Sequence, residues 1–189
     1  MSPKRYAAGR ARALGLPTRG TTAPNRLRRI DRWLVARHGS LLADAADPLV
    51  VDLGYGATPI TAVELHLRLQ EVRPDVRVVG VEIDQERVDA AKSAERPGLT
   101  FVRGGFELAG LRPVVVRALN VLRQYDEAAA GEAWTTLQQG LAPEGILVEG
   151  TCDEIGRRAA WVELDAEGPR TLTLAAHLPT LGRPSDLAE

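Results

Sequence analysis

The sequence predicts an α/β fold built on a mainly parallel sheet that is covered by helices on both faces. Short apolar, β-branched runs, typical of strands buried on both faces, alternate with segments whose apolar residues recur at helical spacing. Near the end of the chain, two alternating segments flank a short turn, which is typical of an antiparallel hairpin. With 189 residues, 44% of them hydrophobic, the chain is long enough to bury the core of one large domain.

A glycine-rich turn follows the first of these strands. The apolar run Leu49–Leu53 contains Asp52 near its end, and Gly54 and Gly56 come directly after it. Glycines allow a tight turn with positive φ and let the backbone approach a ligand closely. A helix is expected to start next, and its N-terminal N–H groups suit a polar or anionic ligand. Pro59 stands where nicotinamide-binding proteins carry the third glycine of GxGxxG, so a nicotinamide cofactor is disfavoured.

A second acidic residue ends the next strand. The β-branched run Arg77–Ile83 places Glu82 at its C-terminal end, and this edge of a parallel sheet faces the same crevice as Gly56. A carboxylate there can accept hydrogen bonds from both ribose hydroxyls of a nucleoside. The alternative is a solvated loop acid, and the spacing favours the ribose role. Asp84 is expected to cap the helix Gln85–Ala94.

These two segments, VVDLGYG and VGVEID, resemble the first two motifs of the class I S-adenosylmethionine-dependent methyltransferases. The resemblance covers roughly residues 49 to 177. It implies a doubly wound, Rossmann-like sheet of seven strands with S-adenosylmethionine (SAM) at its C-terminal edge. Asp52 would hold the methionine end of the cofactor, and Glu82 the ribose. The positions that the resemblance assigns to cofactor binding are Asp52, Gly54, Tyr55, Gly56, Glu82, Ile83, Gly105, Phe106 and Asn120.

The turn after the third strand departs from the family. It follows Leu99–Val102 and reads RGGFELAG, with Gly105 where the family often has an aspartate that recognises the adenine amino group. Backbone groups of Gly105 and Phe106, with the Phe106 ring against the base, would then form the adenine site, or Glu107 would supply the carboxylate. Phe106 has the alternative of a place in the core.

In this family the end of the fourth strand lies beside the donor methyl group. The expected strand is Val114–Arg117, so Arg117, Asn120 and Tyr125 are the candidate catalytic residues. Alternatively, Asn120 caps the loop, Arg117 pairs with a crevice carboxylate and Tyr125 packs. The segment NVLRQY is closer to the NVL segment of small-molecule and RNA methyltransferases than to the NPPY-type motif. Methyl transfer is an in-line displacement that mainly requires positioning, and Tyr125 or Glu149 is the candidate for a general base.

The remaining elements complete the sheet. A helix capped by Asp126 is expected to end at Gly140, and strand five spans Gly145–Gly150. The segments Arg158–Leu164 and Arg170–His177 form the expected hairpin. The connection between strand five and this hairpin contains CDEIGR, which is too short for the helix that the family usually has there.

Cys152 is the single cysteine of the chain, which excludes an internal disulfide and a multi-cysteine metal site. The pair Thr151–Cys152 resembles the nucleophile motif of RNA cytosine C5 methyltransferases, but their second motif, proline-cysteine after strand four, is missing. An inert, partly buried thiol is therefore the favoured interpretation. The three histidines, His38, His66 and His177, show no metal-ligand spacing, so no metal site is expected.

The first 38 residues form a basic region. They hold ten Lys or Arg residues and one acidic residue, Asp31, for a net charge of +9, while the other 151 residues carry −10. Residues 1–23 predict an extended arm, and residues 25–37 predict an amphipathic helix that stops at Gly39. The arginines occupy one face of this helix. The opposite, apolar face is expected to dock on the sheet domain and consists of Leu27, Ile30, Trp33 and Leu34.

The charge of this region has two interpretations. Basic side chains grip phosphates, which favours RNA or another anionic partner. They can equally lie on the acidic body of their own chain or on the second subunit of a homodimer, and we favour this over RNA. We divide the chain into the basic arm and helix, residues 1–38, and a SAM-binding, methyltransferase-like domain, residues 39–189.

The sequence thus predicts a SAM-dependent methyltransferase with a small-molecule or RNA acceptor. One alternative is a catalytically degenerate cofactor-binding or scaffold protein that uses the basic arm, and a less favoured one is a nicotinamide-dependent oxidoreductase. No apolar run approaches the length of a membrane span, and the basic N-terminus lacks the apolar core of a signal peptide. Together with the lone cysteine, this predicts a cytoplasmic protein.

Overall fold

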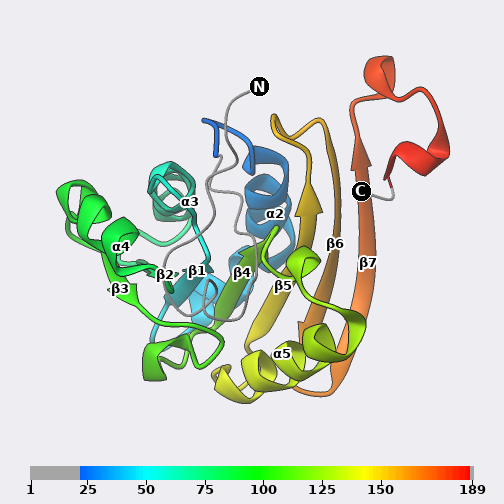
Figure 1. The fold of residues 1–189 in the computed structure, drawn as a ribbon. Coiled ribbons are helices and arrows are strands. Elements are labelled where there is room, and N and C mark those ends of the chain that lie inside the picture. Colours follow the sequence, from blue (N-terminus) through cyan, green and yellow to red (C-terminus); the bar gives the residue numbers. More distant parts are fainter. Residues whose placement is uncertain (1–21, 188–189) are drawn as a thin grey trace.

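The computed structural model describes residues 22–187, which form a seven-stranded sheet with helices on both faces (Figure 1). The strands lie in the order β3-β2-β1-β4-β5-β6-β7; β1 to β5 are parallel, β6 is antiparallel to β5 and β7 to β6. This confirms the expected doubly wound sheet with a C-terminal hairpin. The strands are β1 Leu49–Leu53, β2 Arg77–Glu82, β3 Leu99–Arg103, β4 Val115–Leu119, β5 Ile146–Cys152, β6 Arg158–Asp165 and β7 Gly168–Ala176.

Two apolar cores lie on the two faces of the sheet. On one face pack α2 (Arg28–Asp44), α3 (Ile60–Gln70) and α4 (Gln85–Ala91). On the other face pack α5 (Glu127–Gly140) and the 3₁₀ turn Leu108–Gly110. Because β1 and β4 are covered on both sides, they are buried at every position, as their continuous apolar runs predicted. No helix among residues 22–187 is both long enough and apolar enough to cross a membrane.

The direction of the strand order changes beside β1. From β1 the chain runs through α3 and α4 to β2 and β3 on one side, and it then returns to β4 on the other side of β1. Asp52 in β1 stands in register with Gly80 of β2 and Arg117 of β4. In open α/β sheets, ligands bind outside the carboxyl ends of the strands at such a switch point. The topology therefore places a candidate site above Asp52.

Helix α2 corrects one expectation from the sequence. It continues through Gly39 to Asp44, with non-helical dihedral angles at His38 (φ −120°, ψ 16°) that mark a kink. Gly39 does not have the positive φ that a C-terminal glycine cap requires, and Leu42 beyond it is fully buried. Burial of the apolar residues after Gly39 therefore carries the helix past the expected stop.

The short connection after β5 determines the direction of β6. Strand β5 extends to Cys152, so this residue lies within the strand and not beyond it, and only residues 153–157 link it to β6. A parallel neighbour would need a crossover of a dozen or more residues, so β6 pairs antiparallel to β5. The expected hairpin is confirmed, with β6 and β7 separated by two residues.

Candidate functional site

A cavity of about 660 Å³ opens at the carboxyl ends of β1 to β4, a volume typical of a small-molecule site. The turns after all four of these strands contribute to its wall. Every candidate cofactor residue and two of the three candidate catalytic residues line it, namely Asp52, Gly54, Tyr55, Gly56, Glu82, Ile83, Gly105, Phe106, Asn120 and Tyr125. Arg117 is not among the lining residues.

The two glycines after β1 are needed for different reasons. Gly54 has φ +68°, its N–H donates to the Val81 carbonyl at 2.7 Å, and a Cβ there would lie 2.7 Å from Cγ2 of Val121. Gly56 has φ +88°, but a Cβ there would meet no atom within 4 Å. Gly54 therefore lets the β1 and β4 turns approach each other, whereas Gly56 supplies the positive φ that turns the chain along the cavity.

Glu82 presents a buried carboxylate to the cavity. Its oxygens accept hydrogen bonds from the backbone N–H groups of Gly56 at 3.1 Å, Ile83 at 2.9 Å and Asp84 at 3.3 Å, and Arg87 lies 3.6 Å away. Burial raises the pKa of Glu82, and Arg87 and these N–H groups oppose the rise. The carboxylate thus ties the β1 turn to the β2 turn while remaining on the cavity wall. As expected, Asp84 caps α4 by accepting from the Glu86 N–H.

Two aromatic rings from separate loops meet at the cavity. Phe106, after β3, packs edge-on against Tyr125, after β4, with ring centroids 5.5 Å apart. Next to Phe106, the Gly105 N–H donates to the Glu107 carboxylate at 2.7 Å. The two groups expected to replace the missing aspartate of the adenine site, the Gly105 backbone and the Glu107 carboxylate, therefore lie together on the cavity wall. Burial raises the pKa of Tyr125, so its phenol is a hydrogen-bond donor and not a base at neutral pH.

Asn120 joins the β4 turn to β5. It has φ +63°, its side-chain oxygen accepts from the Cys152 N–H at 3.1 Å, and its amide nitrogen donates to Sγ of Cys152 at 3.1 Å. Cys152 is buried, in agreement with its interpretation as an inert thiol. The Asn120 side chain is therefore engaged with the neighbouring strand, while the residue lines the cavity.

The structure corrects the role expected for Arg117. Because β4 extends to Leu119, Arg117 lies inside the strand, and its side chain is fully buried. It holds Asp52 with a two-pronged contact, Nε to Oδ1 at 3.0 Å and a terminal nitrogen to Oδ2 at 2.8 Å. It also pairs with Asp31 of α2. Of the alternatives drawn from the sequence, pairing with a crevice carboxylate describes this side chain, and contact with a substrate does not.

Neither a protein-family model nor a curated protein matches this chain. Solved structures do. Magnesium protoporphyrin IX methyltransferase from Synechocystis PCC 6803 with bound SAH matches with a TM-score of 0.51 and 22% identity over 66% of this chain and 53% of that chain. The same enzyme with bound SAM matches with the same TM-score, identity and share of this chain, over 56% of its own length. This chain has the class I methyltransferase fold. It spans about half the length of the proteins in these two structures.

In this methyltransferase fold, the N-terminal segment forms one wall of the cavity, which the sequence did not predict. Thr22, Arg26 and Leu27 line it. Arg26 is 7% exposed, and it donates to the carbonyls of Asp153 at 2.9 Å and Cys152 at 3.2 Å. The helical pattern had placed the arginines of this region on an exposed face. Arg26 does not follow this helical pattern because it precedes the first residue of α2, and its side chain extends over the turn after β5.

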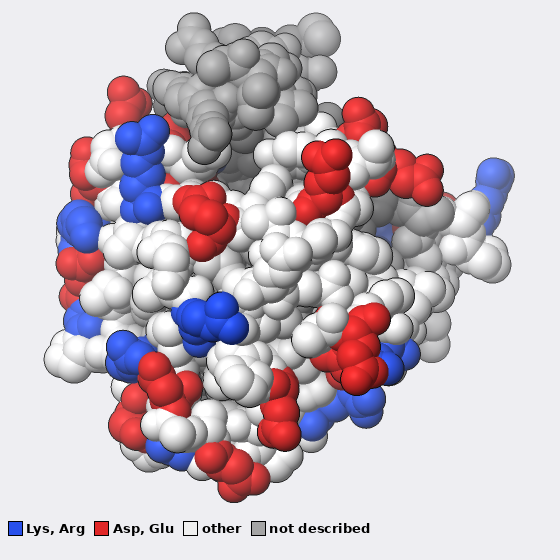
Figure 2. All heavy atoms as spheres, turned by 90° about the horizontal axis from the view of Figure 1, so that it is seen from below, with Lys and Arg blue, Asp and Glu red and all other residues white. Residues whose placement is uncertain are grey.

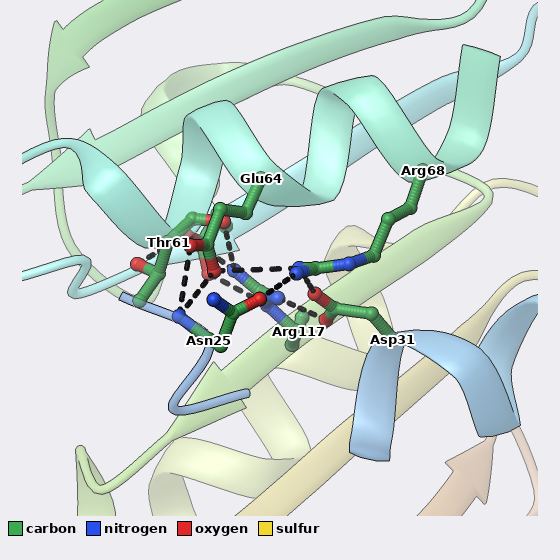
Figure 3. Close-up of polar contacts among 7 residues, drawn as sticks. Asn25, Asp31, Thr61, Glu64, Arg68 and Arg117 are labelled. Atoms are coloured by element: carbon green, nitrogen blue, oxygen red, sulfur yellow. Dashed lines mark hydrogen bonds and ion pairs between the residues drawn. The ribbon is translucent and has the colours of Figure 1, made fainter. Parts of the chain in front are cut away.

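Asp31 is the second residue of this region that the sequence analysis missed. It is fully buried and pairs with Arg117 and, at 2.5 Å, with Arg68 of α3 (Figure 3). Burial raises the pKa of Asp31, and both guanidinium groups oppose the rise. The sequence did contain a sign that Asp31 is buried. Asp31 stands four residues after Leu27 and three before Leu34, which places it on the apolar face of the helix.

Several arginines of α2 and of the residues just before it contact their own chain. Besides Arg26, Arg29 donates to the Gly156 carbonyl at 3.1 Å and Arg37 to Glu163 at 3.1 Å. On the face shown in Figure 2, acidic and basic side chains of the described residues are interspersed. The five basic residues Lys4, Arg5, Arg10, Arg12 and Arg19 of the expected arm lie outside the described residues.

Glu149, the other candidate base, lies outside the cavity wall of this methyltransferase fold, on the face of β5 that α5 covers. Burial raises its pKa to about 7. The folded protein therefore retains a proton on Glu149 that the unfolded chain releases above its ordinary pKa of 4.5. This difference in protonation leaves the free energy of unfolding unchanged below pH 4.5 and lowers it as the pH rises from 4.5 towards 7.

Replacing Glu149 with glutamine is expected to stabilise the protein at pH 8 by on the order of 2 kcal/mol, with no gain near pH 4. Urea unfolding across this pH range, followed by circular dichroism, measures the difference. The matched control is Glu132→Gln, an exposed acid on α5, for which the pH dependence should equal that of the parent. A Glu149→Gln variant no more stable than the parent at pH 8 would contradict the assignment.

Proposed function

We propose that this chain is a SAM-dependent methyltransferase that acts on a small-molecule acceptor. The observation that carries the proposal is the arrangement of one cavity at the switch point of the sheet, in which the Gly54–Gly56 turn and the Glu82 carboxylate face the same space. The solved methyltransferase that shares the fold was determined with SAH and with SAM, which supports this choice of cofactor.

The residues fit such a cofactor at three points. Glu82 would accept hydrogen bonds from the ribose hydroxyls, since its carboxylate is on the wall and the backbone groups around it fix its orientation. Asp52 would face the ammonium group of the methionine end, and Phe106 would pack against the adenine. The space beside Gly56, where a Cβ would meet nothing within 4 Å, leaves room for the ligand. When bound, SAM supplies an electrophilic methyl group on a sulfonium.

The acceptor side of the cavity is formed by the loop after β4 and the N-terminal wall. Tyr125 and Asn120 lie on it together with Arg26. A protonated Tyr125 phenol would orient an acceptor as a hydrogen-bond donor, and the aromatic pair with Phe106 would help exclude water. We favour a small molecule over RNA because Arg29 and Arg37 of α2 are engaged with the Gly156 carbonyl and with Glu163 of the same chain.

Calorimetric titration with S-adenosylhomocysteine (SAH) tests the cofactor. We expect the parent to bind SAH, and Glu82→Ala to weaken binding by roughly ten- to a hundred-fold, about 1.5–3 kcal/mol, because charge-assisted bonds to the ribose are lost. The matched control is Glu86→Ala, an exposed acid of α4, which should bind as the parent does. NAD should give no heat. A folded parent that binds no SAH would contradict the proposal and favour a scaffold protein.

A further inference from the structure

We propose that Asp31, on the N-terminal helix α2, is a positioning residue for the cofactor site: acting through Arg117, it sets the charge and the orientation of Asp52. This inference rests on the proposed function. Asp52 is the only one of the three residues that lines the cavity, so Asp31 and Arg117 act on a ligand through it.

The geometry forms a chain of three buried groups. The Arg117 guanidinium contacts both oxygens of Asp52 on one side and Oδ1 of Asp31 on the other. A terminal nitrogen also donates to the Thr61 carbonyl at 3.0 Å, in the first turn of α3. Figure 3 shows the Arg117 side chain beside Asp31 and Thr61. With Asp52 as the third partner, the guanidinium plane is fixed, and it fixes the plane of the Asp52 carboxylate.

The far end of this chain is anchored to α3 and to the N-terminal segment. Oδ2 of Asp31 pairs with Arg68, which also donates to the Asn25 side chain at 2.9 Å and lies 3.4 Å from Glu64. The Asn25 N–H in turn donates to the Glu64 carboxylate at 2.8 Å. Both Asp31 oxygens thus face guanidinium groups, which is the arrangement of an ionised carboxylate.

Counting charges shows what Asp31 contributes. Arg117 alone would neutralise Asp52 and leave no net charge to attract the ammonium group of a cofactor. With Asp31 included, Asp31, Arg117 and Asp52 carry a net charge of −1, and the sum is still −1 when Arg68 and Glu64 are added. In a dry site this surplus negative charge favours a cationic group beside Asp52.

Docking of α2 does not require this carboxylate. Ile30 and Leu34 are each 1% exposed and already hold the helix on the sheet, and Arg37 contacts Glu163 of β6. Apolar side chains in place of a buried ion pair are often equally stable or more so. The buried charge at Asp31 is therefore explained by its effect on the cofactor site, which it reaches through Arg117 and Asp52.

The test compares two ligands by calorimetry. SAH carries the amino-acid end, whereas 5′-methylthioadenosine has the same nucleoside and thioether without it. Asp31→Asn is expected to weaken SAH by roughly ten-fold, because a unit charge near the site is lost, and to leave 5′-methylthioadenosine within about two-fold. Arg68→Gln removes a positive charge from the same cluster and is expected to strengthen SAH about two- to five-fold, again without effect on 5′-methylthioadenosine.

Glu163→Gln is the matched control, because it removes a buried carboxylate that contacts α2 but lies outside the cavity wall. Both ligands should bind it as they bind the parent. Equal weakening of both ligands by Asp31→Asn, or no weakening of either, would overturn the inference while leaving the proposed function intact. If the Asp31→Asn variant does not fold, unchanged or weaker SAH binding by the Arg68→Gln variant would overturn the inference. A parent that binds neither ligand would overturn the proposed function and this inference together.

Discussion

Replacing Arg117 with methionine is expected to lower the free energy of unfolding by about 3–5 kcal/mol, because removing one partner of a buried ion pair leaves uncompensated charge in the core. Here two carboxylates, Asp31 and Asp52, would lose the guanidinium that they share. Urea unfolding at pH 7, followed by circular dichroism, measures the loss.

The pH dependence of this variant has a defined sign. Burial already raises the pKa of Asp31, and Arg117 is the largest opposing influence, so its removal raises that pKa further. The folded variant would then bind protons more strongly than its unfolded chain does. Its stability should therefore recover as the pH falls from 7 towards the ordinary pKa of 3.8.

Arg170→Met is the control for the loss of an arginine that pairs with two carboxylates. Arg170 contacts Asp165 and Glu167 at the exposed β6–β7 turn, where such pairs contribute about 0–1 kcal/mol. A loss in Arg117→Met no larger than that of Arg170→Met would show that Asp31 and Asp52 are not held as a charged pair by Arg117.

Replacing Gly150 with alanine is the second change for which we expect a large effect. A Cβ there would lie 2.1 Å from the Ala160 carbonyl oxygen and 2.5 Å from Cα of Trp161, both in the backbone of β6. Relief requires β5 and β6 to separate, so we expect a loss of about 3 kcal/mol. The Gly150 carbonyl also accepts from the Asn120 N–H at the cavity edge, so the β4 turn should loosen as well.

Gly131→Ala is the matched control, since a Cβ at this helical position meets nothing within 4 Å. It should stabilise the protein by roughly 0.5–1 kcal/mol, the difference in helix propensity. Thermal unfolding would show opposite shifts, a rise of about 1–4 °C for Gly131→Ala and a fall of about 6–12 °C for Gly150→Ala. A Gly150→Ala variant as stable as the parent would mean that β5 and β6 are not this close.

The parts of the fold that depend on local sequence were predictable. Apolar runs marked the strands, Asp84 and Asp126 were identified as helix caps, and two alternating segments around a short turn predicted the β6–β7 hairpin. The cavity residues that follow the strands were predictable for the same reason, because the turn after each strand lies at one edge of a parallel sheet, whereas the wall formed by Thr22, Arg26 and Leu27 was not.

Contacts between distant segments were not predictable. The expected strand ended at Arg117, which would have put this side chain in the cavity, but β4 continues for two more residues and buries it under α2 and α3. Nothing near Arg117 in the sequence indicates a partner 86 positions earlier. The expected end of α2 at Gly39 was also wrong, because burial of Leu42 outweighed the tendency of a glycine to end a helix.

That separation of 86 residues also has a consequence for the order of folding. Helix α2 precedes all the described strands, yet burying Asp31 before Arg117 is in place would leave one of its carboxylate oxygens without a guanidinium partner in the core. We therefore expect α2 to dock after β1 and β4 have paired, and Asp52 to acquire its final surroundings only in that step. Pulse-labelling hydrogen exchange during refolding should show the amides of α2 becoming protected no earlier than those of β4. Helix α2 would thus be among the last elements to pack, and the segment just before it would then complete the wall of the cavity.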